Sequence, residues 1–179
     1  MARVILVTGG CRSGKSDHAQ KLAESLPPRR AYVATAPILD DEMRHRVAKH
    51  QGARAAEQWD TFEEPVDLAG ALHRASGHNV VLVDCLTLWI NNLMYQAELA
   101  GKAVHEEDVA AASANVLAAC RRHAGTVIFV TNEVGMGIVP DNPLARRYRD
   151  LVGRCNQTLA AGADQVTLVA CGIALQLKG

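Results

Sequence analysis

The sequence has no excess of charge of either sign, no long apolar run and no internal repeat. Its 19 basic and 19 acidic residues cancel, so no overall field attracts a polyanion, and we expect no nucleic-acid partner. No apolar run follows Met1 as a signal peptide would, and none later in the chain reaches the length of a membrane span. These absences predict a cytoplasmic protein with no membrane-spanning segment.

Cysteine is too sparse and too dispersed to predict a disulfide framework or a zinc site. The odd number of thiols, with no C-x-x-C pair, is typical of a reducing compartment. The five are Cys11, Cys85, Cys120, Cys155 and Cys171. A chain of 179 residues is long enough to bury a core without such links, and no linker divides it. We therefore expect a single domain, residues 1–179.

Short apolar runs alternate with longer amphipathic stretches, which is the pattern of a parallel sheet covered by helices on both faces. The expected strands are residues 4–8, 31–34, 80–84, 126–131 and 165–170, with a shorter extended piece at 58–62 and an edge strand at 173–177. The expected helices are residues 16–26, 41–51, 66–75, 86–100, 106–122 and 144–161. The fold class is α/β, a doubly wound and mostly parallel sheet, with ligands at the carboxyl ends of its strands.

The most informative motif joins the first expected strand to the first expected helix. Residues 9–16 read G-G-C-R-S-G-K-S and match the phosphate-loop (P-loop) pattern G-x-x-x-x-G-K-S, with an apolar strand before and an amphipathic helix after. Consecutive N–H groups of such a loop point into one concavity, and the positive end of the helix favours an anion there. The alternative, a glycine-rich turn that only links strand to helix, leaves Lys15 without a role.

The P-loop predicts a bound nucleoside triphosphate with Mg²⁺ and a RecA-like fold of the P-loop NTPase type. Lys15 is expected to reach the outer phosphates, and the Ser16 hydroxyl to ligate the Mg²⁺ that bridges them. The backbone of the whole loop is expected to bind the nucleotide. Its residues are Gly9, Gly10, Cys11, Arg12, Ser13, Gly14, Lys15 and Ser16.

Asp84 ends a second apolar run, as the acid of the partner strand does in many P-loop proteins. At a strand's carboxyl edge it can hold Mg²⁺ directly or through water. The alternative is an acid that caps the helix expected from residue 86. Beside a P-loop we favour the metal role, with Ser16 as the other protein ligand.

Residues 40–54 place basic groups around one histidine. If 41–51 is helical, Arg46 and His50 share a face, and one further turn brings Arg54 onto it. Guanidinium groups favour the neutral, nucleophilic imidazole and can also clamp phosphate oxygens. The alternative is a solvated helix face on which His50 has no role, and spacing leaves both open.

The class of P-loop protein can be narrowed further. The segment after the late strand, N-E-V-G-M-G at residues 132–137, lacks the N-K-x-D that reads guanine in switch GTPases. Helicases and recombinases are longer and carry basic nucleic-acid grooves. A small-molecule kinase or a nucleotidyltransferase remains, and Trp59 and Trp89 are expected to be core or interface residues.

Several segments match one enzyme family together. They are G-G-x-R-S-G-K-S at residues 9–16, Y-V-A-T at 32–35, I-L-D-D-E-M at 38–43, R-x-x-x-H at 46–50, W-x-T-x-E at 59–63 and, most specific, T-N-E-V-G-M-G-I-V-P at 131–140. Through them nearly the whole chain resembles the bifunctional adenosylcobinamide kinase/adenosylcobinamide-phosphate guanylyltransferase. The resemblance implies an enzyme of cobalamin biosynthesis that phosphorylates adenosylcobinamide with ATP or GTP, and then transfers GMP from GTP to adenosylcobinamide phosphate.

The resemblance also implies roles for particular residues. His50 matches the nucleophile that carries a GMP–histidine intermediate, and the family is known as a homotrimer. Beyond the P-loop, the positions that match its nucleotide-binding residues are Ala34, Thr35, Ala36, Gln51, Gly52, Ala53, Arg54, Glu63 and Asp84. Glu63 could read the guanine edge or be an ordinary acid at a strand end. The alternatives that remain are a P-loop kinase without guanylyltransferase activity and a nucleotide-dependent switch.

Overall fold

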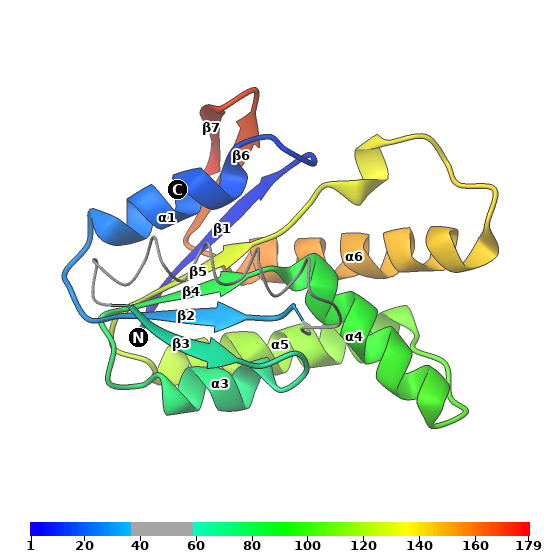
Figure 1. Ribbon diagram of the computed structural model, residues 1–179, viewed down its shortest axis with the longest axis horizontal. Helices are drawn as coiled ribbons and strands as arrows, with labels where there is room; N and C mark the ends of the chain where they lie inside the picture. Colours follow the sequence, from blue (N-terminus) through cyan, green and yellow to red (C-terminus); the bar gives the residue numbers. More distant parts are fainter. Residues whose placement is uncertain (37–58) are drawn as a thin grey trace, which may run out of the picture.

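The computed structural model describes residues 1–36 and 59–179 (Figure 1). The helix expected at 41–51 lies outside the described residues, and so do His50, Gln51, Gly52, Ala53 and Arg54. The strands are β1 (Arg3–Gly9), β2 (Arg30–Ala34), β3 (Trp59–Glu63), β4 (Val80–Asp84), β5 (Thr126–Val130), β6 (Gln165–Ala170) and β7 (Ile173–Lys178). The helices are α1 (Lys15–Glu24), α3 (Leu68–Arg74), α4 (Leu86–Leu99), α5 (Glu106–Arg122) and α6 (Pro143–Gly162), with a 3₁₀ turn, η1 (Val134–Met136).

One seven-stranded sheet runs through the described part of the chain in the order β3-β2-β4-β5-β1-β6-β7. All neighbours pair in parallel except β7, which is antiparallel to β6 at one edge. The strand order reverses at β1, because later strands are added on both of its sides. The doubly wound, mostly parallel sheet is thus confirmed, and the edge at which such a sheet is expected to bind ligands is the carboxyl end of the strands around β1.

Different helices cover the two faces of the sheet (Figure 1). Along β1, Val4 and Leu6 point into a core shared with α3, α4, α5 and α6, whereas Ile5 and Val7 pack on the opposite face with α1. Because both faces of β1 are buried, the sequence shows a continuous apolar run instead of an alternating one. Trp89 of α4 is buried in the larger core and donates its Nε1–H to the Val66 carbonyl oxygen at 2.7 Å, which confirms its core role.

Helix boundaries shifted from their expected positions where a polar side chain caps the first turn. Asp67 accepts from the Gly70 N–H at 2.9 Å, so α3 begins at Leu68 and not at residue 66. Asn142 accepts from the N–H groups of Leu144 and Ala145, so α6 begins one residue early, at Pro143. No helix in residues 1–36 or 59–179 is both long enough and apolar enough to cross a membrane.

Candidate nucleotide site

The P-loop joins β1 to α1 and depends on glycine at two positions. Gly14 has φ 90° and ψ 7°, a left-handed conformation that residues with a side chain rarely adopt. At Gly9 a Cβ atom would lie 2.3 Å from the Val169 carbonyl oxygen, so β6 approaches too closely for any side chain. The loop folds back on itself, with the Ser13 N–H donating to the Gly10 carbonyl oxygen at 3.3 Å.

The first turn of α1 is open to an anion. Its N-cap is Gly14, which has no side chain to accept the free N–H groups of the turn. Lys15 Nζ donates to the Gly10 carbonyl oxygen at 3.2 Å, where the contact is exposed to solvent. A phosphate in the loop can draw this ammonium away from a neutral carbonyl, since a charged acceptor binds it more strongly.

A hairpin turn far along the chain supports the P-loop from outside. The Gly172 N–H, between β6 and β7, donates to the Ser13 carbonyl oxygen at 2.8 Å. Cys171 and Gly172 both have positive φ, 52° and 77°, which makes the tight turn that brings this N–H to the loop. Sequence reasoning identified the edge strand but not its contact with the P-loop, because no local pattern reports it.

Strand register brings Ala34, Glu63 and Asp84, three of the other expected nucleotide residues, to the same edge. Ala34 pairs with both Glu63 and Asp84, and Asp84 pairs with Val130. Val130 in turn pairs with Val7, immediately before Thr8 and the P-loop. The expectation that these positions meet at the carboxyl edge is therefore confirmed, whereas their binding of nucleotide stays a prediction.

Asp84 is half-buried, and its Oδ2 accepts a hydrogen bond from the Tyr32 hydroxyl at 3.3 Å. Asp84 is not the N-cap residue of α4, which is Cys85, and the Cys85 side chain makes no cap hydrogen bond. A carboxylate at a strand end beside a P-loop fits Mg²⁺, which prefers oxygen ligands and commonly takes only one or two from protein. Ser16, half-buried on the first turn of α1, is the other expected ligand.

The described residues contain no group of three or more His, Cys, Asp or Glu side chains that could hold a metal ion by themselves. The Ser16 and Asp84 pair does not need such a group, because Mg²⁺ keeps waters and takes oxygens from the nucleotide. The donor set therefore suits a metal that arrives with its nucleotide.

Thr35 lies at the carboxyl edge of the sheet, but its polar atoms hydrogen-bond to other parts of the protein. Its hydroxyl donates to the Cys85 carbonyl oxygen and accepts from the Cys85 N–H, both at 2.8 Å. Its own carbonyl oxygen accepts from Asn92 Nδ2 at 2.8 Å. Thr35 is fully buried and directly follows β2, so these hydrogen bonds tie the end of β2 to the start of α4.

The segment after β5, the most specific of the motifs that match the family, is held by α6. Arg149 donates to the Gly135 carbonyl oxygen at 2.8 Å, and Arg146 donates to the carbonyl oxygens of Pro140 and Asp141 at 2.9 and 2.7 Å. Apolar side chains remain outside this clamp. They are Met136, Ile138 and Val139, exposed by 77%, 96% and 62%. In Figure 1 the segment extends beyond the carboxyl ends of the strands before it joins α6.

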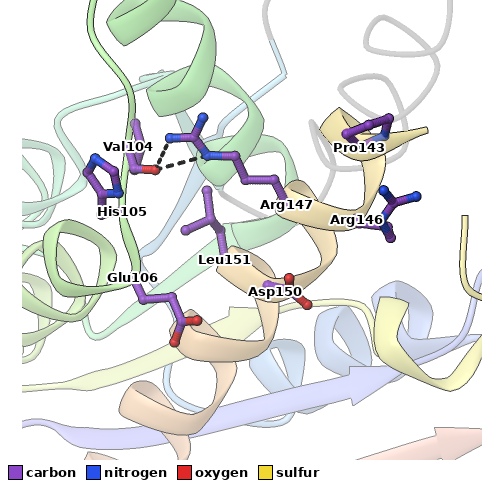
Figure 2. Close-up of a pocket in the computed structure, with 8 residues that line it drawn as sticks. All are labelled: Val104, His105, Glu106, Pro143, Arg146, Arg147, Asp150 and Leu151. Atoms are coloured by element: carbon purple, nitrogen blue, oxygen red, sulfur yellow. Dashed lines mark hydrogen bonds between the residues drawn. The ribbon is translucent and has the colours of Figure 1, made fainter. Parts of the chain in front are cut away.

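A separate cleft lies between the start of α5 and the first turns of α6 (Figure 2). Figure 2 shows Arg147 pointing at the Val104 carbonyl oxygen, to which its Nε donates at 3.2 Å. Glu106, at the same cleft, pairs with Arg154 at 2.7 Å. These charged groups join the two helices to each other, so we assign the cleft a structural role.

Comparison with known proteins decides the family. Residues 5–177 match the family described as cobinamide kinase / cobinamide phosphate guanyltransferase. The chain belongs to this family. It is 43% identical over 183 residues to the bifunctional adenosylcobalamin biosynthesis protein CobU of Escherichia coli (strain K12), a match that covers 98% of this chain and 99% of the relative.

Other relatives of the cobinamide kinase / cobinamide phosphate guanyltransferase family agree. The protein of the same name from Salmonella typhimurium (strain LT2) is 44% identical over 185 residues, covering 98% of this chain and 99% of its own. The bifunctional adenosylcobalamin biosynthesis protein CobP of Pseudomonas aeruginosa is 38% identical over 175 residues, covering 97% and 96%. A KaiC-like protein from Pyrococcus horikoshii OT3 superposes with a TM-score of 0.56 at 16% identity, over 93% of this chain and 70% of its own. That likeness confirms the RecA-like fold alone.

Proposed function

We propose that this protein is a bifunctional enzyme of cobalamin biosynthesis. It phosphorylates the aminopropanol hydroxyl of adenosylcobinamide with ATP or GTP, and then transfers GMP from GTP to adenosylcobinamide phosphate. The second step yields adenosyl-GDP-cobinamide and pyrophosphate. The observation that carries the proposal is the meeting, at one sheet edge, of a P-loop, Asp84 and the family-specific segment 131–140 in a member of this family.

The P-loop residues support the phosphoryl step. The N–H groups around Gly14 and the Lys15 ammonium are placed to neutralise the outer phosphates of the donor. Ser16 and Asp84 would hold Mg²⁺, which supplies positive charge to the phosphate oxygens when bound. Neither step needs a nucleic acid, and none is part of the proposal.

Guanylyl transfer needs attack at the α-phosphorus, and His50 is the residue that the family resemblance assigns to it. A histidine nucleophile splits the substitution into two in-line steps: GMP first bonds to the imidazole as pyrophosphate leaves, and the cobinamide phosphate then displaces the histidine. The sequence holds a single P-loop, so we propose one pocket used in two modes.

The proposal also covers where the corrinoid binds, the compartment and the oligomeric state. The exposed apolar residues Met136, Ile138 and Val139, next to the nucleotide edge, offer contacts for a large corrinoid. The enzyme acts in the cytoplasm as a homotrimer, as the family resemblance implies.

Labelled GTP tests both activities in one assay. Incubated with adenosylcobinamide, the protein is expected to place γ-label on adenosylcobinamide phosphate and α-label on adenosyl-GDP-cobinamide. Transfer of γ-label without any transfer of α-label would support a kinase alone. Hydrolysis of GTP with no labelled corrinoid would support a nucleotide-dependent switch instead.

A further inference from the structure

One carboxylate stands beside the P-loop and has no part in binding phosphate or Mg²⁺ as described above. Glu133 lies just past β5, the strand between the P-loop strand and the Asp84 strand. Its N–H donates to the Gly9 carbonyl oxygen at 3.3 Å, and its Oε1 accepts from the Thr8 hydroxyl at 2.8 Å. Both contacts fix the carboxylate at the entry to the P-loop.

A buried polar network orients this carboxylate. Asn156 of α6 donates its Nδ2–H groups to Glu133 Oε1 at 3.2 Å and to the Asn132 carbonyl oxygen at 3.0 Å. Its Oδ1 accepts from the Thr131 hydroxyl at 2.7 Å. Asn156 is 7% exposed and Thr131 is fully buried. Buried polar groups are costly unless they are paired, so a paired network that holds Asn156 against this carboxylate indicates that the position of the carboxylate matters.

The network leaves acceptor capacity unused. Both hydrogen bonds to the Glu133 carboxylate are to Oε1, and within residues 1–36 and 59–179 Oε2 accepts no hydrogen bond. The neighbouring Asn132 Oδ1 is buried and also has no donor in that part of the chain. Glu133 is half-exposed, so its free oxygen can meet a donor from a bound substrate.

We propose that Glu133 is the general base of the kinase reaction and that guanylyl transfer does not use it. This rests on the proposed function. The two acceptors differ in one proton: the cobinamide hydroxyl must lose a proton as it attacks, whereas the cobinamide phosphate is already an anion. Only the first acceptor needs a base.

Glu133 Oε2 accepts the hydroxyl proton while the alcohol oxygen forms its bond to the γ-phosphorus. The bond between that phosphorus and the bridging oxygen breaks, and the nucleoside diphosphate leaves with the electron pair. The carboxylic acid then returns its proton to solvent.

Glu133→Gln isolates the base, because the amide oxygen can still accept from Thr8 and Asn156. We expect the kinase kcat to fall by about 100-fold or more, the range that a positioned base contributes. Guanylyl transfer, measured with supplied adenosylcobinamide phosphate, is expected to stay within about threefold of wild type. Glu107→Gln, at an exposed glutamate of α5, is the matched control and should change neither rate.

The outcomes separate this assignment from the proposed function. Equal loss of both activities, or retention of the kinase rate, overturns Glu133 as the base. A wild-type protein with no kinase activity overturns the proposed function and the assignment with it. If Glu133→Gln does not fold, Glu133→Asp keeps the charge on a shorter arm, and it must show the same selective loss of the kinase rate.

Discussion

Replacing Asn156 by alanine removes three hydrogen bonds to the residues that follow the carboxyl end of β5. The side chain bonds to the Thr131 hydroxyl, the Asn132 carbonyl oxygen and Glu133 Oε1 at 2.7, 3.0 and 3.2 Å. Glu133 keeps its bond from Thr8, but the Thr131 hydroxyl and the Asn132 carbonyl lose the partner that Asn156 supplied. The perturbation therefore leaves two polar groups unsatisfied.

The expected cost follows from those two groups. A buried donor or acceptor left without a partner costs about 1–3 kcal/mol, and a part-buried one costs less. The Thr131 hydroxyl is buried and the Asn132 carbonyl oxygen is part-buried, so we expect a loss of about 2–5 kcal/mol in the free energy of unfolding. For a protein of this size each kcal/mol lowers the melting temperature by about 2–4 °C. A middle value of about 3 kcal/mol then corresponds to a drop of about 6–12 °C.

Urea unfolding measured by circular dichroism gives the free energy directly. Gln157→Ala, the exposed neighbour on the same helix, is the control and should stay within about 0.5 kcal/mol of wild type. The double variant Thr131→Val with Asn156→Leu removes both partners of the shortest bond, so it should cost less than the sum of its single variants. A loss below about 1 kcal/mol for Asn156→Ala would contradict a stabilising role for these three hydrogen bonds.

Three further predictions concern the P-loop and the core. Gly14→Ala forces a side chain into a left-handed conformation, which costs about 1–2 kcal/mol and disturbs the P-loop. The rise in melting temperature that GTP with Mg²⁺ causes should therefore shrink or vanish in this variant, and an undiminished rise would contradict this. Burial lowers the pKa of His123 below its ordinary 6.5, so the unfolded state binds the proton more readily. The free energy of unfolding should therefore fall as pH drops below 6.5 and level off below the pKa of His123 in the folded state. Urea midpoints measured across this pH range should lack this fall in His123→Gln. Trp89→Phe loses the bond to the Val66 carbonyl oxygen and should cost about 1–3 kcal/mol in urea unfolding; an unchanged midpoint argues against that bond.

The order and type of the helices and strands could be predicted because each depends on the hydrophobic pattern of its own residues. A run such as residues 4–7, buried on both faces, reads as a strand without reference to any other segment. Helix starts were less predictable, because Asp67 and Asn142 act as caps and the apolar period does not show them. The place of β5 between β1 and β4 depends on pairing across the sheet and leaves no trace in sequence spacing.

The candidate site divides in the same way. The P-loop and Asp84 could be predicted from the sequence because each belongs to a short local pattern at the end of an apolar strand. Glu133 and Thr8 are 125 positions apart in the chain, and Asn156 is a polar residue that α6 turns inward. Such a network forms only when distant segments pack, so sequence reasoning could mark residues 131–140 as specific but could not say what they contact.

In the function that we propose, His50 attacks the α-phosphorus of a nucleotide held by the P-loop. Incubating the protein with GTP and Mg²⁺, digesting it and mapping the peptides by mass spectrometry tests this most directly. We expect GMP on the peptide that contains His50 and no adduct in His50→Asn. An unmodified wild-type protein, or GMP on any other residue, would contradict it.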